Sequence, residues 1–169
     1  LPYILFDKIN VPTIMHDEIG YWANAAKFAG YDWKGILKEV PYYSYGYSLI
    51  LSPIIYFFHH SNISYSIAML LNGLFLTVTF LSLYRTSTLL FKDKNTVLRI
   101  LVSLVATLCP AVIVLSHYAW AEGLLIMCTS IVIMAMVEVL VNINLFKVIF
   151  LAFITVFTYC VHQRSIVII

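Results

Sequence analysis

The chain has 169 residues, of which 62% are hydrophobic and 11% charged, and its mean hydropathy is +0.94. Ordinary soluble domains carry roughly 45–50% apolar and about 25% charged residues, so this composition excludes a soluble globule and a disordered chain and indicates an exterior that faces lipid. With a net charge of +2 and scattered basic residues, the chain has no basic patch for nucleic acid, and we expect no nucleic-acid partner.

The charged residues divide the chain into a polar head, residues 1–45, and an apolar body. Half of them precede residue 46, and the segment from Gly46 to Tyr84 contains none. Within the head, residues 17–28 carry apolar side chains at helical spacing. These are Ile19, Trp22, Ala23 and Ala26. The pattern predicts a loop with one amphipathic helix that can rest on a membrane surface.

Residues 46–62 join the head to the body. The apolar stretch from Tyr47 to Phe58 is too short to span a bilayer and has Pro53 in its middle. Apolar segments of about 10 to 14 residues more often lie at the interface or re-enter, and the aromatic side chains here suit the headgroup level. We therefore predict a juxtamembrane helix. The alternative, a kinked span, would invert the sidedness of everything that follows.

Four continuous apolar segments beyond residue 62 predict transmembrane helices. A helix needs about 20 residues to cross a hydrocarbon core of about 30 Å, and unbroken runs without alternation favour helices over barrel strands. The segments are 63–84, 100–119, 123–141 and 148–161. We therefore predict an all-α fold in which residues 1–169 form one polytopic integral membrane domain, placed in the cell membrane as a multi-pass protein.

Basic residues near the predicted spans indicate the sidedness. They lie between the first two spans and before the last one, namely at Arg85, Lys92, Lys94, Arg99 and Lys147. By the positive-inside rule these connections are cytoplasmic. The head, residues 116–122 and residues 162–164 then lie outside, so three polar clusters should meet on one extracytoplasmic face.

The first cluster is His16-Asp17-Glu18, followed by Tyr21. Adjacent acids cannot face the same way on a helix, so one can point into a site while the other caps the helix or binds a basic partner. We expect Asp17 to be the inward-facing acid. The alternative is that Asp17 only stabilises the start of a helix through the helix dipole.

The second cluster holds His117, Tyr118 and Glu122 at a predicted membrane edge. A carboxylate at the start of a span usually faces a cavity or a partner, although Glu122 could also reach the interface and Tyr118 could belong to an aromatic belt. The third cluster holds His162 and Arg164. Arg164 could clamp a phosphate with two hydrogen bonds or snorkel to the headgroups.

The sequence calls for no required cofactor. Cys109, Cys128 and Cys160 lie in apolar runs at spacings that match no metal-ligand pattern, and the pair His59-His60 has no further ligands beside it. A divalent metal beside Asp17 is possible, but no spacing demands one.

Two segments carry a resemblance to a known family. They are Asp17-Glu18-Ile19-Gly20-Tyr21-Trp22 in the head and the aromatic run of residues 42–53, followed by alternating spans. Together they resemble the N-terminal part of a GT-C glycosyltransferase, most closely the protein O-mannosyltransferase and aminoarabinose-transferase branch. The Pro-Pro-Leu signature of that branch is replaced here by Tyr45-Gly46-Tyr47-Ser48-Leu49. Because the chain starts at Leu1 without Met and ends in a new apolar run, we expect it to be a fragment of a longer protein.

The resemblance implies an enzyme that moves a hexosyl or pentosyl unit from a polyprenyl-phosphate donor to a lipid, protein or glycan acceptor at the outer face of the membrane. The catalytic candidates are Asp17, as general base, and Glu18, as its orienter. The substrate-binding candidates are His16, Tyr21, His117, Tyr118, Glu122, His162 and Arg164. The alternative is a non-catalytic transporter, flippase or export subunit for lipid-linked glycans, and a third option is a membrane scaffold.

Overall fold

A computed structural model describes residues 16–31, 44–58, 60–91, 95–163 and 165 of the chain. Within these residues the protein is helical and contains no strand, which confirms the predicted all-α class. The helices are α1 (His16–Phe28), α3 (Tyr45–Phe57), α4 (Ser61–Leu90), α5 (Thr96–Thr107), α6 (Pro110–Leu115), α7 (Ala121–Val141) and α8 (Leu145–Val161).

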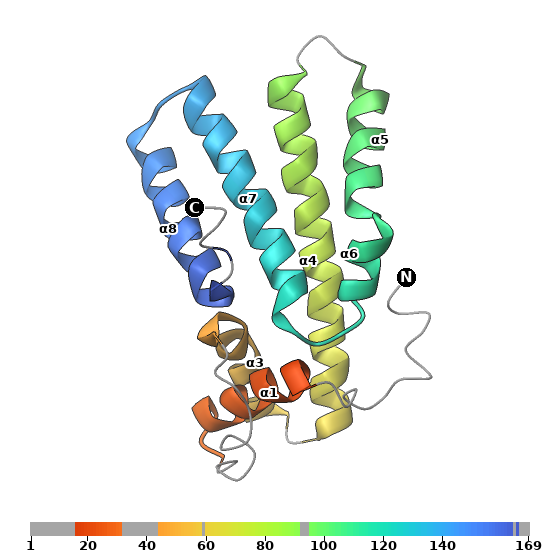
Figure 1. The fold of residues 1–169 in the computed structure, drawn as a ribbon, viewed down its shortest axis with the longest axis vertical. Helices are drawn as coiled ribbons and strands as arrows, with labels where there is room; N and C mark the ends of the chain where they lie inside the picture. The colour runs from red at the N-terminus through yellow and green to blue at the C-terminus, as the bar shows by residue number, and fades with distance from the viewer. Residues whose placement is uncertain (1–15, 32–43, 59, 92–94, 164, 166–169) are drawn as a thin grey trace.

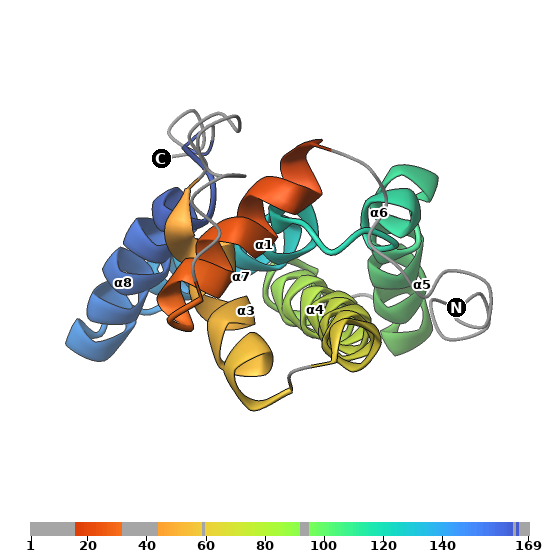
Figure 2. The same cartoon turned by 90° about the horizontal axis from the view of Figure 1, so that it is seen from below.

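Four helices, α4, α5, α7 and α8, run along the length of the molecule, and α1 and α3 lie across one end of them (Figure 1). We call this the capped end. It also holds the connection between α6 and α7 and the C-terminal end of α8, and Figure 2 views the molecule from this side. The last turn of α4, the first turn of α5 and the connection from α7 to α8 lie at the opposite end.

The centre of the bundle is the parallel pair α4 and α7. On α4, one series of buried residues recurs at alternating spacings of three and four, and most of its members are small or polar. They are Tyr65, Ala68, Asn72, Phe75, Thr79, Ser82 and Thr86. On α7, Ala121, Leu124, Cys128 and Ala135 follow similar spacings. This periodicity gives the shallow crossing of coiled coils, and the small side chains let the two backbones approach closely.

Helix α5 buries polar side chains and exposes apolar ones, the reverse of a helix on the surface of a protein in water. Its buried residues are Ser103 and Thr107, and their hydroxyls donate to the carbonyls one turn earlier, Arg99 O and Ser103 O, both at 2.8 Å. Large apolar side chains such as Leu101 and Val105 are exposed instead. By length and composition, residues 62–90 and α7 could each cross a membrane, whereas α5 and α8 are shorter apolar helices.

The prediction of one continuous helix over residues 100–119 is wrong. The chain leaves the α-helix after Thr107, and a separate short helix, α6, begins at Pro110. Proline cannot donate a backbone hydrogen bond and disfavours helical geometry at the residue before it, and Cys109 accordingly has extended torsion angles (φ −53°, ψ 132°). The other three predicted spans fall on α4, α7 and α8, which extend beyond the predicted limits.

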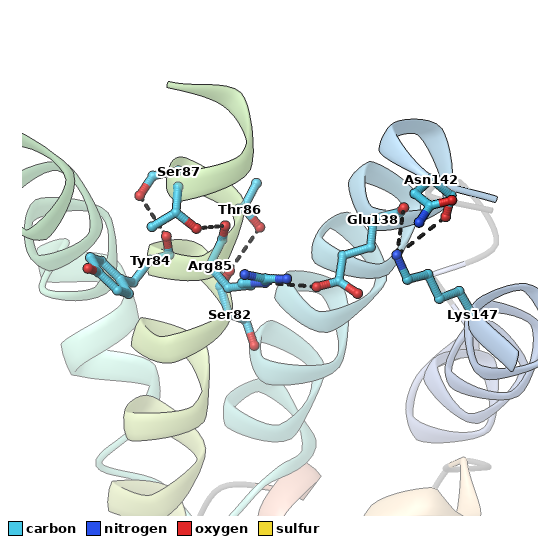
Figure 3. A network of polar contacts seen from close by, with 9 residues as sticks. Ser82, Tyr84, Arg85, Thr86, Ser87, Glu138, Asn142 and Lys147 are labelled. Carbon is cyan, nitrogen blue, oxygen red and sulfur yellow. Dashed lines mark hydrogen bonds and ion pairs between the residues drawn. The ribbon is translucent and has the colours of Figure 1, made fainter. Parts of the chain in front are cut away.

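Polar contacts join α4, α7 and α8 at the opposite end (Figure 3). Arg85 Nε donates to Glu138 Oε1 at 2.8 Å, and Lys147 Nζ donates to the carbonyls of Glu138 and Asn142 at 3.4 and 3.3 Å. A cation near the last carbonyls of a helix is favoured by the helix dipole. Because Arg85 is more than half exposed, the ion pair contributes only about 0–1 kcal/mol to stability.

Gly46 provides a test of how α3 packs on α8. A methyl group at this position would lie 2.7 Å from backbone atoms of Val161, so one of the two helices would have to shift. We expect Gly46→Ala to lower the free energy of unfolding by about 1–3 kcal/mol. Gly73, inside α4, has no atom within 4 Å of such a methyl group and serves as the matched control.

We expect Gly73→Ala to be neutral or to stabilise by about 0.5–1 kcal/mol, because alanine favours a helix interior. The measurement is unfolding of the purified protein in detergent. Equal effects of the two substitutions would contradict the close packing of α3 on α8.

Candidate functional site

The helix α1 carries the first cluster of candidate residues. Its first turn contains Asp17 and Glu18 and its last turn contains Lys27, an order that the helix dipole favours. It ends where Gly30 adopts a positive φ of 89°, which allows Tyr31 N to donate to Ala26 O at 2.9 Å. The predicted helix is therefore present.

The apolar face of α1 packs mainly on α3. Trp22, Ala23 and Ala26 are buried, and the ring of Tyr21 meets that of Tyr47 edge-on with 5.7 Å between centroids. Ser48 Oγ on α3 also donates to Tyr21 O at 2.9 Å. These contacts, together with the position of α1 across the end of the bundle, fix the helix against the protein (Figure 2).

Glu18 is the polar centre of the capped end. Its side chain is fully buried, and Oε1 accepts hydrogen bonds from Tyr65 Oη at 3.0 Å and from the backbone N–H of Ala119 at 2.9 Å. One oxygen atom therefore connects α1, α4 and the connection between α6 and α7. A buried carboxylate is costly unless such donors compensate for the lost water.

The expectation that Asp17 faces inward is wrong. Asp17 is exposed, and Glu18 is the acid that points into the protein. Glu18 is the acid that reaches donors inside the protein, Tyr65 Oη and the Ala119 N–H, whereas residue 17 is rotated by about 100° from residue 18.

Residues 116–120, which we call the α6–α7 turn, carry the second cluster. Asn72 of α4 is fully buried, and its Nδ2 donates to Ser116 O at 3.0 Å and to Tyr118 O at 2.7 Å. Trp120 Nε1 donates to Leu115 O at 2.8 Å. Side chains thus donate to two carbonyls of this non-helical segment and to the carbonyl just before it.

His117 Nδ1 lies 2.6 Å from Ile113 O. Because a carbonyl can only accept, Nδ1 is the donor in this contact, and the other ring nitrogen is Nε2. That Nε2 is buried and has no hydrogen-bond partner among the residues that the structure describes.

Tyr47 adds a buried hydroxyl that sequence reasoning did not single out. It is fully buried, and its hydroxyl has no hydrogen-bond partner within the described part of the chain. Burial, and next the negative charge of Glu18, raise the pKa of Tyr47 well above its usual value, and Glu122 acts in the same direction. Tyr47 therefore stays neutral within the electrostatic reach of two carboxylates.

The remaining candidates also belong to the capped end. His16 begins α1, Tyr118 packs its ring 4.8 Å from that of Trp120, Glu122 lies in the first turn of α7, and His162 follows the last residue of α8. Arg164 lies outside the described residues. The third cluster is joined to the head where Gln163 N donates to Ser44 Oγ at 3.2 Å.

The described residues form no preassembled metal site. Among the described residues, no group of three or more His, Cys, Asp or Glu side chains is placed to hold a metal ion. A divalent cation beside Asp17 stays a prediction.

The chain matches no protein-family model, no curated protein and no solved structure. What the capped end can do must therefore follow from its own residues. It combines an exposed carboxylate, a buried carboxylate fixed by two donors, and a histidine with a buried ring nitrogen.

Two tyrosine-to-phenylalanine substitutions test the hydrogen bonding around Glu18. Tyr65→Phe removes one of the two donors that the described residues give to the buried Glu18 carboxylate, so we expect the free energy of unfolding to fall by about 1–3 kcal/mol. Tyr47→Phe removes a hydroxyl without a described partner, and we expect it to be neutral within about 0.5 kcal/mol or stabilising.

Denaturant unfolding of the two purified variants measures this difference. Tyr159, exposed on α8, supplies the control Tyr159→Phe. A large loss with Tyr47→Phe would show that its hydroxyl has a partner beyond the described residues, and no loss with Tyr65→Phe would contradict the role of Glu18.

Proposed function

We propose that the chain is the N-terminal membrane region of an integral membrane glycosyltransferase that takes a sugar from a polyprenyl phosphate at the outer membrane face. The observation that carries this proposal is the opposite orientation of two adjacent acids. Glu18 is anchored inside the capped end, and its neighbour Asp17 is exposed there. One acid is suited to hold a position, and the other to meet a substrate.

Insertion in a membrane is supported by the inverted faces of α5 and by the lengths of α4 and α7. At 1.5 Å per residue, the 30 residues of α4 extend about 45 Å, which matches a bilayer of about 40–45 Å with its headgroups. Arg85, Arg99 and Lys147 belong to the opposite end, which we assign to the cytoplasm. The capped end is then extracytoplasmic.

In the proposed reaction, Asp17 is the general base. The acceptor hydroxyl attacks the anomeric carbon, its proton passes to the Asp17 carboxylate, and the bond between that carbon and the phosphate oxygen breaks. A positioned general base accelerates such a step by typically about 10²–10⁴-fold. Glu18 is buried and already accepts two hydrogen bonds, so its role is to hold α1 in place.

Negative charge grows on the leaving phosphate, and cationic or hydrogen-bonding groups must stabilise it. Arg164 has the planar, forked geometry that binds phosphate with two hydrogen bonds. It follows His162 closely in the sequence, and His117 belongs to the same end of the bundle. We assign the phosphate to these residues and the sugar to Tyr118, Glu122 and His16. Tyr21, also a candidate for sugar binding, is buried in the core and packs on Tyr47 instead.

The lipid part of the donor explains why such a site would sit on a helical bundle. A polyprenyl chain remains in the bilayer, so its phosphate can be reached only from the membrane surface. The exposed aromatic residues of α3, namely Tyr45, Tyr56 and Phe57, have the composition of a headgroup-level surface near α1.

Accessibility labelling tests the sidedness. In a cysteine-free background, Gln163→Cys probes the capped end and Asn142→Cys the opposite end, since both positions are exposed. We expect a membrane-impermeant maleimide to label residue 163 in intact cells and residue 142 only after permeabilisation. The reverse pattern would place the capped end in the cytoplasm and remove the outer-face reaction.

Asp17→Asn tests the chemistry, because it keeps the size of the side chain and removes the base. We expect turnover of the full-length enzyme to fall by about 10²–10⁴-fold while donor binding is retained. The matched control is Glu138→Gln, an acid at the opposite end, which should keep its turnover. Both use purified protein with a polyprenyl-phosphate hexose and a polyprenyl-phosphate pentose.

Full turnover with Asp17→Asn would contradict the assignment of the base. If the parent protein moves a lipid-linked glycan across a vesicle membrane and forms no new glycosidic bond, the transporter alternative replaces the enzyme.

A further inference from the structure

Asn72 occupies an unusual place on α4. It is fully buried within a segment without charged residues, and its Nδ2 donates to the carbonyls on either side of His117, those of Ser116 and Tyr118. A polar amide inside an apolar helix is costly unless it has partners, and such residues commonly join one helix to another part of the protein.

The α6–α7 turn, which accepts the hydrogen bonds of Asn72, also donates one to Glu18. The residue after Tyr118 is Ala119, whose N–H donates to Glu18 Oε1 at 2.9 Å. Tyr65, seven residues before Asn72 and thus on the same face of α4, donates to the same oxygen. Helix α4 therefore fixes Glu18 twice, directly through Tyr65 and indirectly through Asn72 and the α6–α7 turn.

The depth of the turn explains why it needs Asn72. Eleven residues separate Ser61, the first residue of α4, from Asn72, so the turn lies about 16 Å along the helix from its start. In Figure 1 the first part of α4 likewise extends past the turn beside α1 and α3. Irregular backbone packed against a helix this far from the helix end is stable only where the protein satisfies its polar groups.

We infer that Asn72 is a positioning residue for the carboxylate pair. By holding the carbonyls of Ser116 and Tyr118 it orients the Ala119 N–H, which holds Glu18, and the fixed Glu18 sets the place of Asp17 on the outer face. This inference rests on the proposed function for the role of Asp17, whereas the mechanical coupling from Asn72 to α1 holds whatever the chemistry.

Hydrogen exchange of the full-length protein in lipid nanodiscs tests the coupling. The variant Asn72→Asp keeps the shape but places a carboxylate against two carbonyls, so we expect exchange in α1 and in residues 116–122 to accelerate about tenfold. Peptides from the opposite end, around Glu138, should not change. Thr79→Val is the matched control, because Thr79 is buried on the same face and its hydroxyl bonds within its own helix, to Phe75 O.

Glu18→Gln should reproduce the acceleration in α1. Unchanged exchange in α1, or acceleration of all peptides to the same extent, would overturn the inference in favour of a purely structural residue. If Asn72→Asp does not fold, Asn72→Ser, which removes the donors without adding charge, is held to the same two criteria.

Kinetics separate positioning from binding. For a positioning residue we expect Asn72→Asp to lower kcat about tenfold and leave KM for a polyprenyl-phosphate hexose unchanged, and we expect the losses from Asn72→Asp and Glu18→Gln to be non-additive. A raised KM with unchanged kcat would overturn the inference. A parent enzyme without transferase activity would refute the proposed function alone, because the exchange experiment would still decide the coupling.

Discussion

The arrangement of the capped end depends on a single buried carboxylate oxygen. Glu18 Oε1 accepts from Tyr65, 47 residues away, and from the backbone of Ala119, 101 residues away. Apolar packing is non-directional, so hydrophobic burial alone does not specify where a short helix such as α1 must lie. Two donors converging on one buried acceptor do specify it, since a displacement of α1 would break both of these hydrogen bonds to a buried carboxylate.

The same principle distinguishes the two ends of the bundle. At the opposite end, an ion pair with a largely exposed arginine and a lysine near helix carbonyls join α4, α7 and α8. Exposed charges of this kind are replaced readily by water and contribute little. At the capped end the joining groups are buried and include Asn72 and Tyr65 of α4. The stronger constraint thus lies where the candidate residues are.

Sequence periodicity and charge placement predicted the helices and the grouping of the three clusters at one end. The helices follow from residue patterns within one segment, and the grouping of the clusters follows from the alternation of sides with each predicted span. The inward acid was assigned wrongly because two adjacent carboxylates look alike until the buried face of α1 is known. The helix break before α6 was missed although Pro110 marks it, because the apolar run on both sides outweighed the proline. Asn72 was visible as an amide in an uncharged segment, but its partners lie 44 and 46 residues away.

The adjacency of Asp17 and Glu18 suits the role of surface base that we propose for Asp17. A carboxylate that meets substrate must be exposed, and an exposed side chain on a short helix at the end of a bundle is poorly positioned by packing alone. Its immediate neighbour on a helix points about 100° away, so the neighbour can be buried while the first stays exposed. One peptide unit joins the two, and the anchor therefore limits the position of Asp17 far more tightly than an anchor one or two turns away. A second acid beside an exposed one on such a helix therefore restricts the position of the exposed acid. This requires that the protein interior offers hydrogen-bond donors to the second acid, as Tyr65 and Ala119 do for Glu18.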